Sequence, residues 1–289
     1  MTVETRLRIN NYVLIIGAMK CGTTSLFNIL AQHPEVAPCS FKEPQFFAWE
    51  KNYALGIDYY QDLWNWNRDR HKIAMEASTS YTKVHKTELN CAKNIALLKD
   101  KANFKFIYIL RNPIDRIESE CKHRVQKGYT SAKELADKPI TEETIGTSRY
   151  ALQLEEYYQR FDAGDILLVD FDELKSASPE WIKGICRFLE IEDSYDFSNL
   201  NNIHHNSKEK SISSNWRYQK IPFKKELSYL SAKLPFGFKK TIHQIFGSNS
   251  SSDFKLSKIQ KEQIARDLRE EMQLLESKYN FKSDRWNLC

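Results

Sequence analysis

The feature that most constrains the fold is an uninterrupted apolar segment near the start of the chain, Tyr12 to Gly17 (YVLIIG), which ends at a glycine. A run of β-branched and aliphatic residues without alternation is typical of a parallel strand buried on both faces. Apolar residues then follow at helical spacing between Thr23 and Gln32, and either Thr23 or Thr24 is suited to cap that helix. A buried strand, a glycine-containing loop and a capped helix form the opening unit of a parallel α/β sheet.

The same two patterns alternate along the rest of the chain. Short apolar runs predict strands at 72–76, 104–110 and 166–169; periodic segments predict helices over 88–99, 113–127, 149–161, 179–189 and 257–279, with a loop or short helices over 128–147. We therefore predict an α/β fold: a central parallel β-sheet flanked by helices on both faces, of the P-loop-like nucleotide-binding type. Residues 1–289 are expected to form a single domain, with the serine-rich segment 247–253 as a surface linker before the last helix.

The composition excludes several classes of protein. Apolar residues make up 41% of the chain and aromatic residues 12%, with only 9 Gly and 8 Pro, which excludes disordered and collagen-like chains. The 43 basic and 38 acidic residues leave a net charge of +5, and this small, dispersed excess suits a small anionic ligand better than nucleic acid. The six cysteines include no CxxC pair, so neither a disulfide framework nor a metal site is expected.

We expect neither a membrane segment nor an export signal. No stretch reaches the roughly 18 to 20 apolar residues that span a bilayer, and the first ten residues contain no apolar run of the kind found in secretory signals. We therefore expect a cytoplasmic protein without a membrane partner.

The loop after the first strand carries the most informative motif, Gly17-Ala-Met-Lys20-Cys-Gly22-Thr23-Thr24. Its glycines have the spacing of a nucleotide phosphate loop, but Thr23 stands where a Walker A motif needs lysine. Backbone N–H groups at a helix N-terminus still bind an anion, and Lys20 inside the loop can reach a phosphate oxygen. The strand at 104–110 leads into Arg111, where a kinase or NTPase usually has an aspartate for Mg²⁺. The chain thus offers a cation where a metal-bound nucleotide would need a carboxylate.

Two segments together resemble those of sulfotransferases that use 3′-phosphoadenosine 5′-phosphosulfate (PAPS). IIGAMKCGTTSLFNIL is similar to their 5′-phosphosulfate loop, and YILRNPIDRIESECKH is similar to their 3′-phosphate motif. The segment KEPQFF from Lys42 to Phe47 and the later LLVDFDELKSASPEWIKGICRFLEI resemble the heparan-sulfate branch and its bacterial relatives. The resemblance covers roughly residues 12 to 215. It implies a sulfotransferase fold and a sulfotransferase that takes PAPS as donor, releases the desulfonated product PAP and requires no metal.

By that resemblance, donor-binding residues come from three parts of the chain. Those implied for the 5′-phosphosulfate are Lys20, Cys21, Gly22, Thr23, Thr24 and Ser25, and those for the 3′-phosphate are Arg111, Ser119 and Lys210. Arg111 also fits on physical grounds, because it follows the carboxyl end of a central strand, where α/β sheets bind ligands, and because a guanidinium matches phosphate bidentately. Two features depart from the family pattern. In the heparan-sulfate enzymes a lysine follows the carboxylate residue of the second strand, and here that position is Ala77. Residues 206–211 stand in place of the family's Lys-Gly-Arg loop.

Sulfuryl transfer needs a base for the acceptor proton and stabilisation of charge on the leaving oxygen. Lys20 is suited to the second task, and the resemblance implies that Glu43 performs the first. His123, on the helix after Arg111, is the alternative base. The residues expected to contact the acceptor are Phe46, Phe47, Glu76 and His123.

The acceptor is expected to be a small molecule with a hydroxyl or amine, such as a secondary metabolite of the saxitoxin class of guanidinium alkaloids. Aromatic and acidic residues after Glu43, including Trp49, could bind a flat cation. Three alternatives stay open: a heparan-like glycan acceptor, a P-loop kinase acting on a small metabolite, and a nucleotide-binding module without catalysis.

Overall fold

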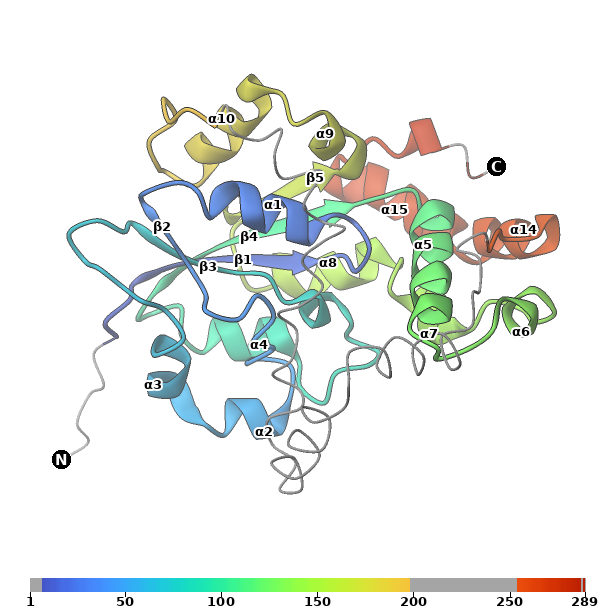
Figure 1. Ribbon diagram of the computed structural model, residues 1–289, viewed down its shortest axis with the longest axis horizontal. Coiled ribbons are helices and arrows are strands. Elements are labelled where there is room, and N and C mark those ends of the chain that lie inside the picture. Colours follow the sequence, from blue (N-terminus) through green and yellow to red (C-terminus); the bar gives the residue numbers. More distant parts are fainter. Residues whose placement is uncertain (1–6, 198–253, 287, 289) are drawn as a thin grey trace, which may run out of the picture.

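The strands form one parallel sheet with β1 at its centre. The structure, a computed structural model, describes residues 7–197, 254–286 and 288, and in these the sheet has five strands in the order β2-β3-β1-β4-β5 (Figure 1). The strands are β1 (Asn11–Gly17), β2 (Val36–Pro38), β3 (Ile73–Glu76), β4 (Asn103–Leu110) and β5 (Ile166–Asp170). Each neighbouring pair is parallel. The predicted parallel α/β fold is confirmed.

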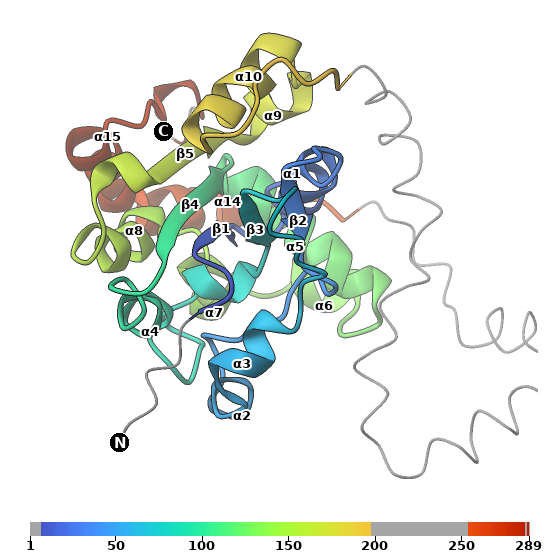
Figure 2. The same cartoon turned by 90° about the vertical axis from the view of Figure 1, so that its left-hand side faces the viewer.

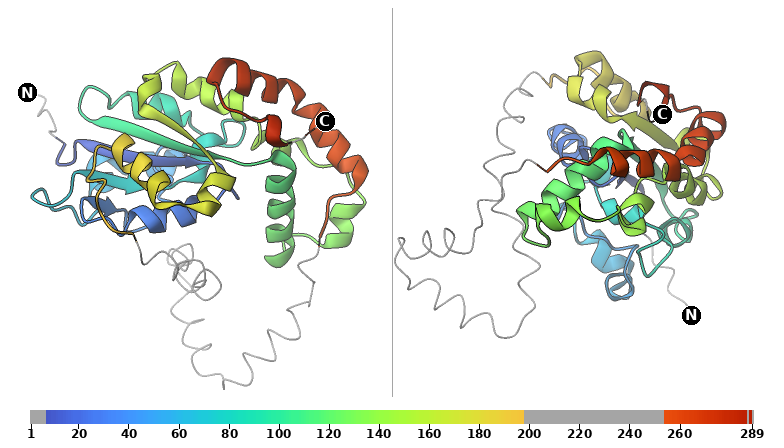
Figure 3. Two further views of the ribbon diagram at one scale, coloured as in Figure 1. Left: turned by 90° about the horizontal axis from the view of Figure 1, so that it is seen from above. Right: turned by 90° about the vertical axis from the view of Figure 1, so that its right-hand side faces the viewer.

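Helices cover both faces of the sheet. One face carries α1 (Thr23–Leu30), α9 (Phe171–Ser176) and α10 (Pro179–Phe188), and the other carries α4 (Cys91–Ala96), α8 (Tyr150–Tyr158) and α15 (Arg269–Tyr279), as Figures 2 and 3 show. Beyond the carboxyl ends of the strands stands α5 (Pro113–Gln126), beside α6 (Ala132–Ala136), α7 (Glu142–Gly146) and α14 (Lys258–Asp267) (Figure 1). The short helices α2 (Glu50–Tyr53) and α3 (Gly56–Gln61) lie together at the bottom of Figure 2. The 3₁₀ turn η1 (Thr79–Thr82) follows β3 in the chain.

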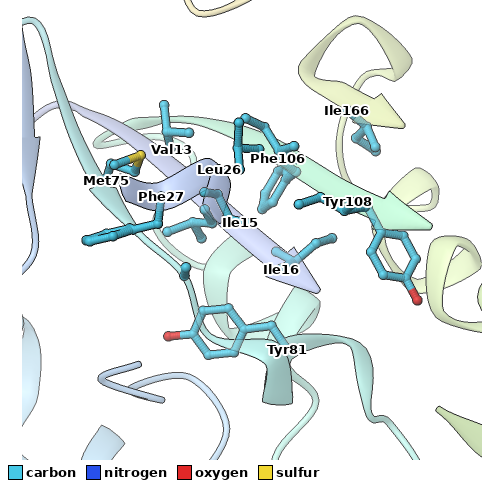
Figure 4. Close-up of a cluster of buried hydrophobic side chains, with 14 of the residues drawn as sticks. Val13, Ile15, Ile16, Leu26, Phe27, Met75, Tyr81, Phe106, Tyr108 and Ile166 are labelled. Carbon is cyan, nitrogen blue, oxygen red and sulfur yellow. The ribbon is translucent and has the colours of Figure 1, made fainter. Parts of the chain in front are cut away.

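The apolar run that opens the chain is buried on both sides, as its sequence predicts. Val13 and Ile15 of β1 pack in one cluster with Met75 of β3, Phe106 of β4 and Leu26 of α1 (Figure 4). Because β1 lies between β3 and β4, and helices cover both faces, every side chain from Tyr12 to Ile16 is at most 1% exposed. This rigid centre fixes the position at which the glycine loop leaves the sheet.

The closing helix differs from the prediction. Instead of one helix over 257–279, α14 and α15 meet at Leu268, whose backbone (φ −110°, ψ 5°) is not helical. Leu268 is fully buried with Ile264 and with Ile117 of α5. The chain therefore bends to bury this leucine, an effect of tertiary packing that helical periodicity does not reveal. The strand β2 and the helices α2 and α3 were not predicted, because each is too short for a clear periodic pattern.

Four further expectations concern the linker, disulfides, membrane spans and metal sites. The predicted linker 247–253 lies outside them. The cysteines within them, Cys21, Cys39, Cys91, Cys121 and Cys186, are unpaired. Of the helices in this part of the chain, none combines the length and the apolar character needed to cross a bilayer, and no group of three potential metal ligands is found there.

Candidate active site

The loop between β1 and α1 is fixed against the neighbouring strand at the carboxyl edge of the sheet. The Ala18 N–H donates to the carbonyl of Ile109 in β4 at 2.9 Å, and the Cys21 N–H donates to the Ala18 carbonyl at 3.1 Å. The N-cap of α1 is Gly22, so no side chain accepts a hydrogen bond from the first turn of the helix. Uncapped N–H groups and the helix dipole together favour an anion at this position.

Both the backbone conformation at residue 22 and the space around it require a glycine. Its φ of 85° lies in the left-handed region, which a residue with a β-carbon adopts at a cost. A β-carbon there would also lie 2.9 Å from Cδ2 of Leu174 and 3.1 Å from Cε2 of Phe171. The second glycine of the motif therefore allows the loop to pack tightly against α9.

Arg111 is held beside this loop, although the two are far apart in the sequence. Its Nη1 donates to the Lys20 carbonyl at 3.1 Å, and its guanidinium carbon lies 4.5 Å from the centre of the Phe171 ring. The Arg111 carbonyl accepts a hydrogen bond from the Tyr150 hydroxyl at 2.8 Å. Lys20 and Arg111 thus place two cations at one site. The pKa of Lys20 is lowered, first by burial and second by the charge of Arg111. Such a pair of neighbouring cations is suited to an anionic ligand.

A cavity of about 620 Å³ opens beside the loop and brings together residues that are distant in the sequence. Its lining includes Lys20, Thr23 and Thr24 from the loop and α1, Glu43, Lys83 and His123. Burial, and after it the charge of Lys20, lowers the pKa of His123 from its ordinary value of 6.5, which favours the neutral imidazole. A lysine, a glutamate and a histidine therefore share one cavity.

The carboxylate of Glu43 is oriented by two neighbours. The Lys42 ammonium donates to Oε1 at 2.9 Å, and the Thr79 hydroxyl donates to Oε2 at 3.4 Å. Lys42 also lies 3.5 Å from the Thr23 hydroxyl, which ties this segment to the start of α1. The Glu43 side chain stays 35% exposed, so it is accessible from the cavity.

Three residues expected to contact an acceptor lie in the core instead. Phe46 and Phe47 are 2% and 0% exposed and pack on the Tyr60 ring at 4.5 Å and 5.1 Å between centroids. Glu76 is fully buried, and neither it nor the two phenylalanines line the cavity. The expectation of direct acceptor contact is not supported for these three, because aromatic packing withdraws them from the surface.

Glu76 organises the segment that carries Glu43. Its carboxylate accepts hydrogen bonds from the hydroxyls of Tyr60 and Tyr81, both at 2.7 Å, and of Ser78 at 2.5 Å. The Ser78 hydroxyl oxygen in turn accepts from the Gln45 N–H at 3.0 Å. Burial raises the pKa of Glu76 to about 7, although the three hydroxyl donors oppose that shift.

Of the remaining predicted donor-binding residues, Cys21 has a buried thiol whose pKa burial raises to about 11. Ser25 lies half-buried in the first turn of α1, and Ser119 lies half-buried on α5, about two helical turns from Arg111. Lys210 falls outside the described residues.

Two lysines near the site, Lys42 and Lys83, were not among the predicted site residues. The adjacent acidic residue was the available signal for Lys42. The signal for Lys83 in the sequence is its position after β3, because that strand ends at the carboxyl edge of the sheet.

A larger cavity of about 1010 Å³ lies at the opposite edge of the sheet, beside the amino ends of β1 and β4. Several of its cations are already paired: Arg8 with Asp62, Lys72 with Glu35 and Lys105 with Glu190. We place the chemistry at the smaller cavity, because the glycine loop and Lys20 line it and because parallel sheets bind ligands at the carboxyl ends of their strands.

Comparisons with known proteins find several relatives of this chain. Human (Homo sapiens) bifunctional heparan sulfate N-deacetylase/N-sulfotransferase 2 is 30% identical over 201 residues, which cover 62% of this chain and 22% of that protein. Mouse (Mus musculus) heparan sulfate glucosamine 3-O-sulfotransferase 5 is 28% identical over 190 residues, covering 62% of this chain and 53% of that protein. The chain therefore spans about a fifth to a half of the length of these curated relatives.

A solved structure shares the fold. A sulfotransferase from Alicyclobacillus acidocaldarius superposes with a TM-score of 0.65 at 19% identity, over 97% of this chain and 99% of that chain. The family profile described as "Sulfotransferase domain" matches residues 10–276, a range that includes the glycine loop, Glu43 and Arg111. The predicted resemblance is confirmed, and the chain belongs to the sulfotransferase domain family.

Proposed function

We propose that this protein transfers a sulfuryl group from PAPS to a hydroxyl or amine of a small-molecule acceptor, without a metal ion. The observation that carries the proposal is the meeting of Lys20, Glu43 and His123 in one cavity beside an uncapped helix N-terminus. This arrangement offers fixed positive charge for an anionic donor and a carboxylate for the acceptor proton.

In this proposal the residues around the loop bind the donor. The N–H groups of the first turn of α1, with Thr23, Thr24 and Ser25, would hold the 5′-phosphosulfate, and Lys20 would neutralise the bridging oxygen as it leaves. Arg111 would bind the 3′-phosphate, with Ser119 and Lys210 as further contacts. The contact of Arg111 with the Lys20 carbonyl supports this division, because it holds the guanidinium beside the loop.

Glu43 would take the acceptor proton, with His123 as the alternative base. The exposed part of the Glu43 carboxylate faces the cavity, and Lys42 fixes its orientation. The cavity wall also contains Trp49, whose Nε1–H donates to Gln45 at 2.7 Å. A fixed indole ring beside a carboxylate suits a flat, cationic acceptor, which favours a secondary metabolite.

A glycan acceptor is the second candidate. It is favoured by the relatives, whose names give heparan sulfate as their substrate. Turnover with a panel of small cationic metabolites and with desulfated heparan, measured by transfer of ³⁵S from labelled PAPS, separates the two acceptor classes.

The donor assignment is tested by thermal shift with PAP, with ATP plus Mg²⁺, and with no ligand. We expect PAP to raise the Tm in the presence of EDTA, because the N–H groups and cations of the protein replace the metal as counter-charges. Stabilisation by MgATP alone, or a PAP response abolished by EDTA, would contradict the donor assignment and favour a kinase. Binding of PAP without sulfuryl transfer to any acceptor or to water would favour a nucleotide-binding module.

A further inference from the structure

A second lysine of the cavity has no assigned role. Lys83 follows η1 directly and lines the cavity together with Lys20. Its ammonium lies 3.1 Å from the thioether sulfur of Met19, the residue that precedes Lys20 in the loop. Lys83 is thus in direct contact with the loop that the proposed function assigns to the phosphosulfate.

The ammonium of Lys83 is poorly satisfied by the protein. Within the part of the chain that the structure describes, its one hydrogen-bond partner is the Met19 sulfur, and no carboxylate forms an ion pair with it. A thioether is a weak acceptor, whereas an ammonium has three donors. Burial lowers the pKa of Lys83, as expected for a cation removed from water without an ionic partner.

The neighbouring lysines differ in this respect. Lys86 lines the same cavity, but its ammonium is bound by the carboxylate of Glu143. Lys42 is paired with Glu43 at 2.9 Å. Lys83 therefore keeps free donor capacity in a semi-buried position, where an unpaired charge is costly until an anion binds.

The charges around Lys83 act on its pKa in opposite directions. Glu120 and Glu43 favour its protonated form, whereas Lys86 and Arg116 oppose it. Lys83 lines the same cavity as Glu43 and contacts the glycine loop through Met19. A group that passes from a donor on the loop to an acceptor at Glu43 therefore moves within the cavity that Lys83 lines.

We propose that Lys83 is a further catalytic residue, whose ammonium binds the non-bridging oxygens of the sulfuryl group during transfer. The inference rests on the proposed function. In the transfer, the bond between sulfur and the bridging oxygen of the 5′-phosphate breaks, and its electron pair stays on that oxygen. The acceptor oxygen or nitrogen forms the new bond to sulfur, and its proton passes to Glu43. Lys83 keeps its own proton and stabilises charge on the sulfuryl oxygens throughout.

The experiment uses transfer to water, so that no acceptor has to be known. Lys83→Met keeps the length of the side chain and removes its charge, and Lys83→Arg restores a charge. Lys86→Met is the matched control. It also removes a charge from the cavity wall, but Glu143 already neutralises that charge. Inorganic ³⁵S-sulfate release from labelled PAPS is measured without acceptor, and dissociation constants for PAP and PAPS are measured by calorimetry.

We expect Lys83→Met to slow sulfate release about 10²-fold, in the range measured for loss of one charge-stabilising donor. Its affinity for PAP should stay within about threefold of the wild type, whereas the ratio of its PAPS affinity to its PAP affinity should fall. Lys83→Arg should recover part of the rate, and Lys86→Met should change it by less than about threefold.

Each other outcome overturns the assignment. An equal loss of affinity for PAP and PAPS would mean that Lys83 binds a phosphate of the nucleotide. An unchanged rate of sulfate release, together with an unchanged ratio of the PAPS and PAP affinities, would mean that Lys83 does not contact the sulfuryl group. If release is too slow to measure, the ratio of the PAP and PAPS dissociation constants decides alone. Failure of the wild type to bind PAP would instead refute the proposed function, and the role of Lys83 with it.

Discussion

The ammonium of Lys42 lies 2.9 Å from one carboxylate oxygen of Glu43, its neighbour in the sequence, and the Thr79 hydroxyl faces the other oxygen at 3.4 Å. Each carboxylate oxygen has two lone pairs, so both contacts leave room for an acceptor proton. The contacts fix the direction of the carboxylate while a third of the side chain stays exposed. A base in this position is preorganised before the acceptor arrives.

Glu43→Gln should lower kcat by about 10² to 10⁴, the usual contribution of a general base, because an amide cannot take the proton. The affinity for PAP, read by calorimetric titration, should stay unchanged, since the variant keeps the size of the side chain. Glu50→Gln, an exposed residue in the same region, is the control and should retain wild-type turnover. Full kcat in Glu43→Gln, together with loss of kcat but not of PAP binding in His123→Ala, would assign the base to His123.

Lys42→Met should lower kcat by about three- to tenfold and leave PAP affinity unchanged, because it removes a partly exposed pairing partner rather than the base itself. Comparison of kcat in the single variants and in Lys42→Met/Glu43→Gln tests the coupling: the double variant should be no slower than Glu43→Gln alone. A further loss in the double variant would show that Lys42 acts independently of Glu43.

Arg111→Lys should weaken PAP binding by about 10- to 100-fold, equivalent to the 1.5–3 kcal/mol of hydrogen bonds to a charged group. Lysine keeps the charge, but it cannot stack on the Phe171 ring or donate bidentately as a guanidinium does. Adenosine 5′-phosphosulfate, which lacks the 3′-phosphate, serves as the control ligand and should lose much less affinity. Equal losses for both ligands would place Arg111 at the 5′ end of the donor.

The parts of the site that the sequence predicts are those with local signals. The strands β1 and β4 are long apolar runs, and the loop and Arg111 follow them directly, so their place at the carboxyl edge follows from the parallel fold. The chain from Lys42 to Phe47 is different, because its motif does not distinguish the side chains that face the cavity from those that face the core. Burial of Phe46, Phe47 and Glu76 is decided by Tyr60 and Tyr81, which come from other segments. For the same reason Lys83, which has no motif around it, is revealed only when η1 is seen to approach the loop.

The buried carboxyl of Glu76 should make the stability of the fold depend on pH. Its pKa is raised to about 7 in the folded protein, against a reference value of 4.5, and burial is the main cause. The folded state therefore holds this proton more tightly than the unfolded chain does. Its contribution to stability is fully present below pH 4.5 and is lost as the pH rises through about 7.

Glu76→Gln should remove that dependence, because an amide keeps hydrogen-bonding groups toward the hydroxyls of Tyr60, Tyr81 and Ser78 but does not ionise. Between pH 5.5 and pH 8.0 the free energy of unfolding of the wild type should fall by about 2 kcal/mol relative to the variant, from integration of the two pKa values. Urea denaturation at the two pH values measures this difference, and Glu270→Gln, an exposed carboxyl on α15, controls for the loss of one charge. Other titrating groups contribute equally to the wild type and the variant, so they cancel in the comparison. A constant difference between the two proteins across this range would show that Glu76 ionises at the same pH in the folded and unfolded chains, and that its three hydroxyl donors fully offset the effect of burial.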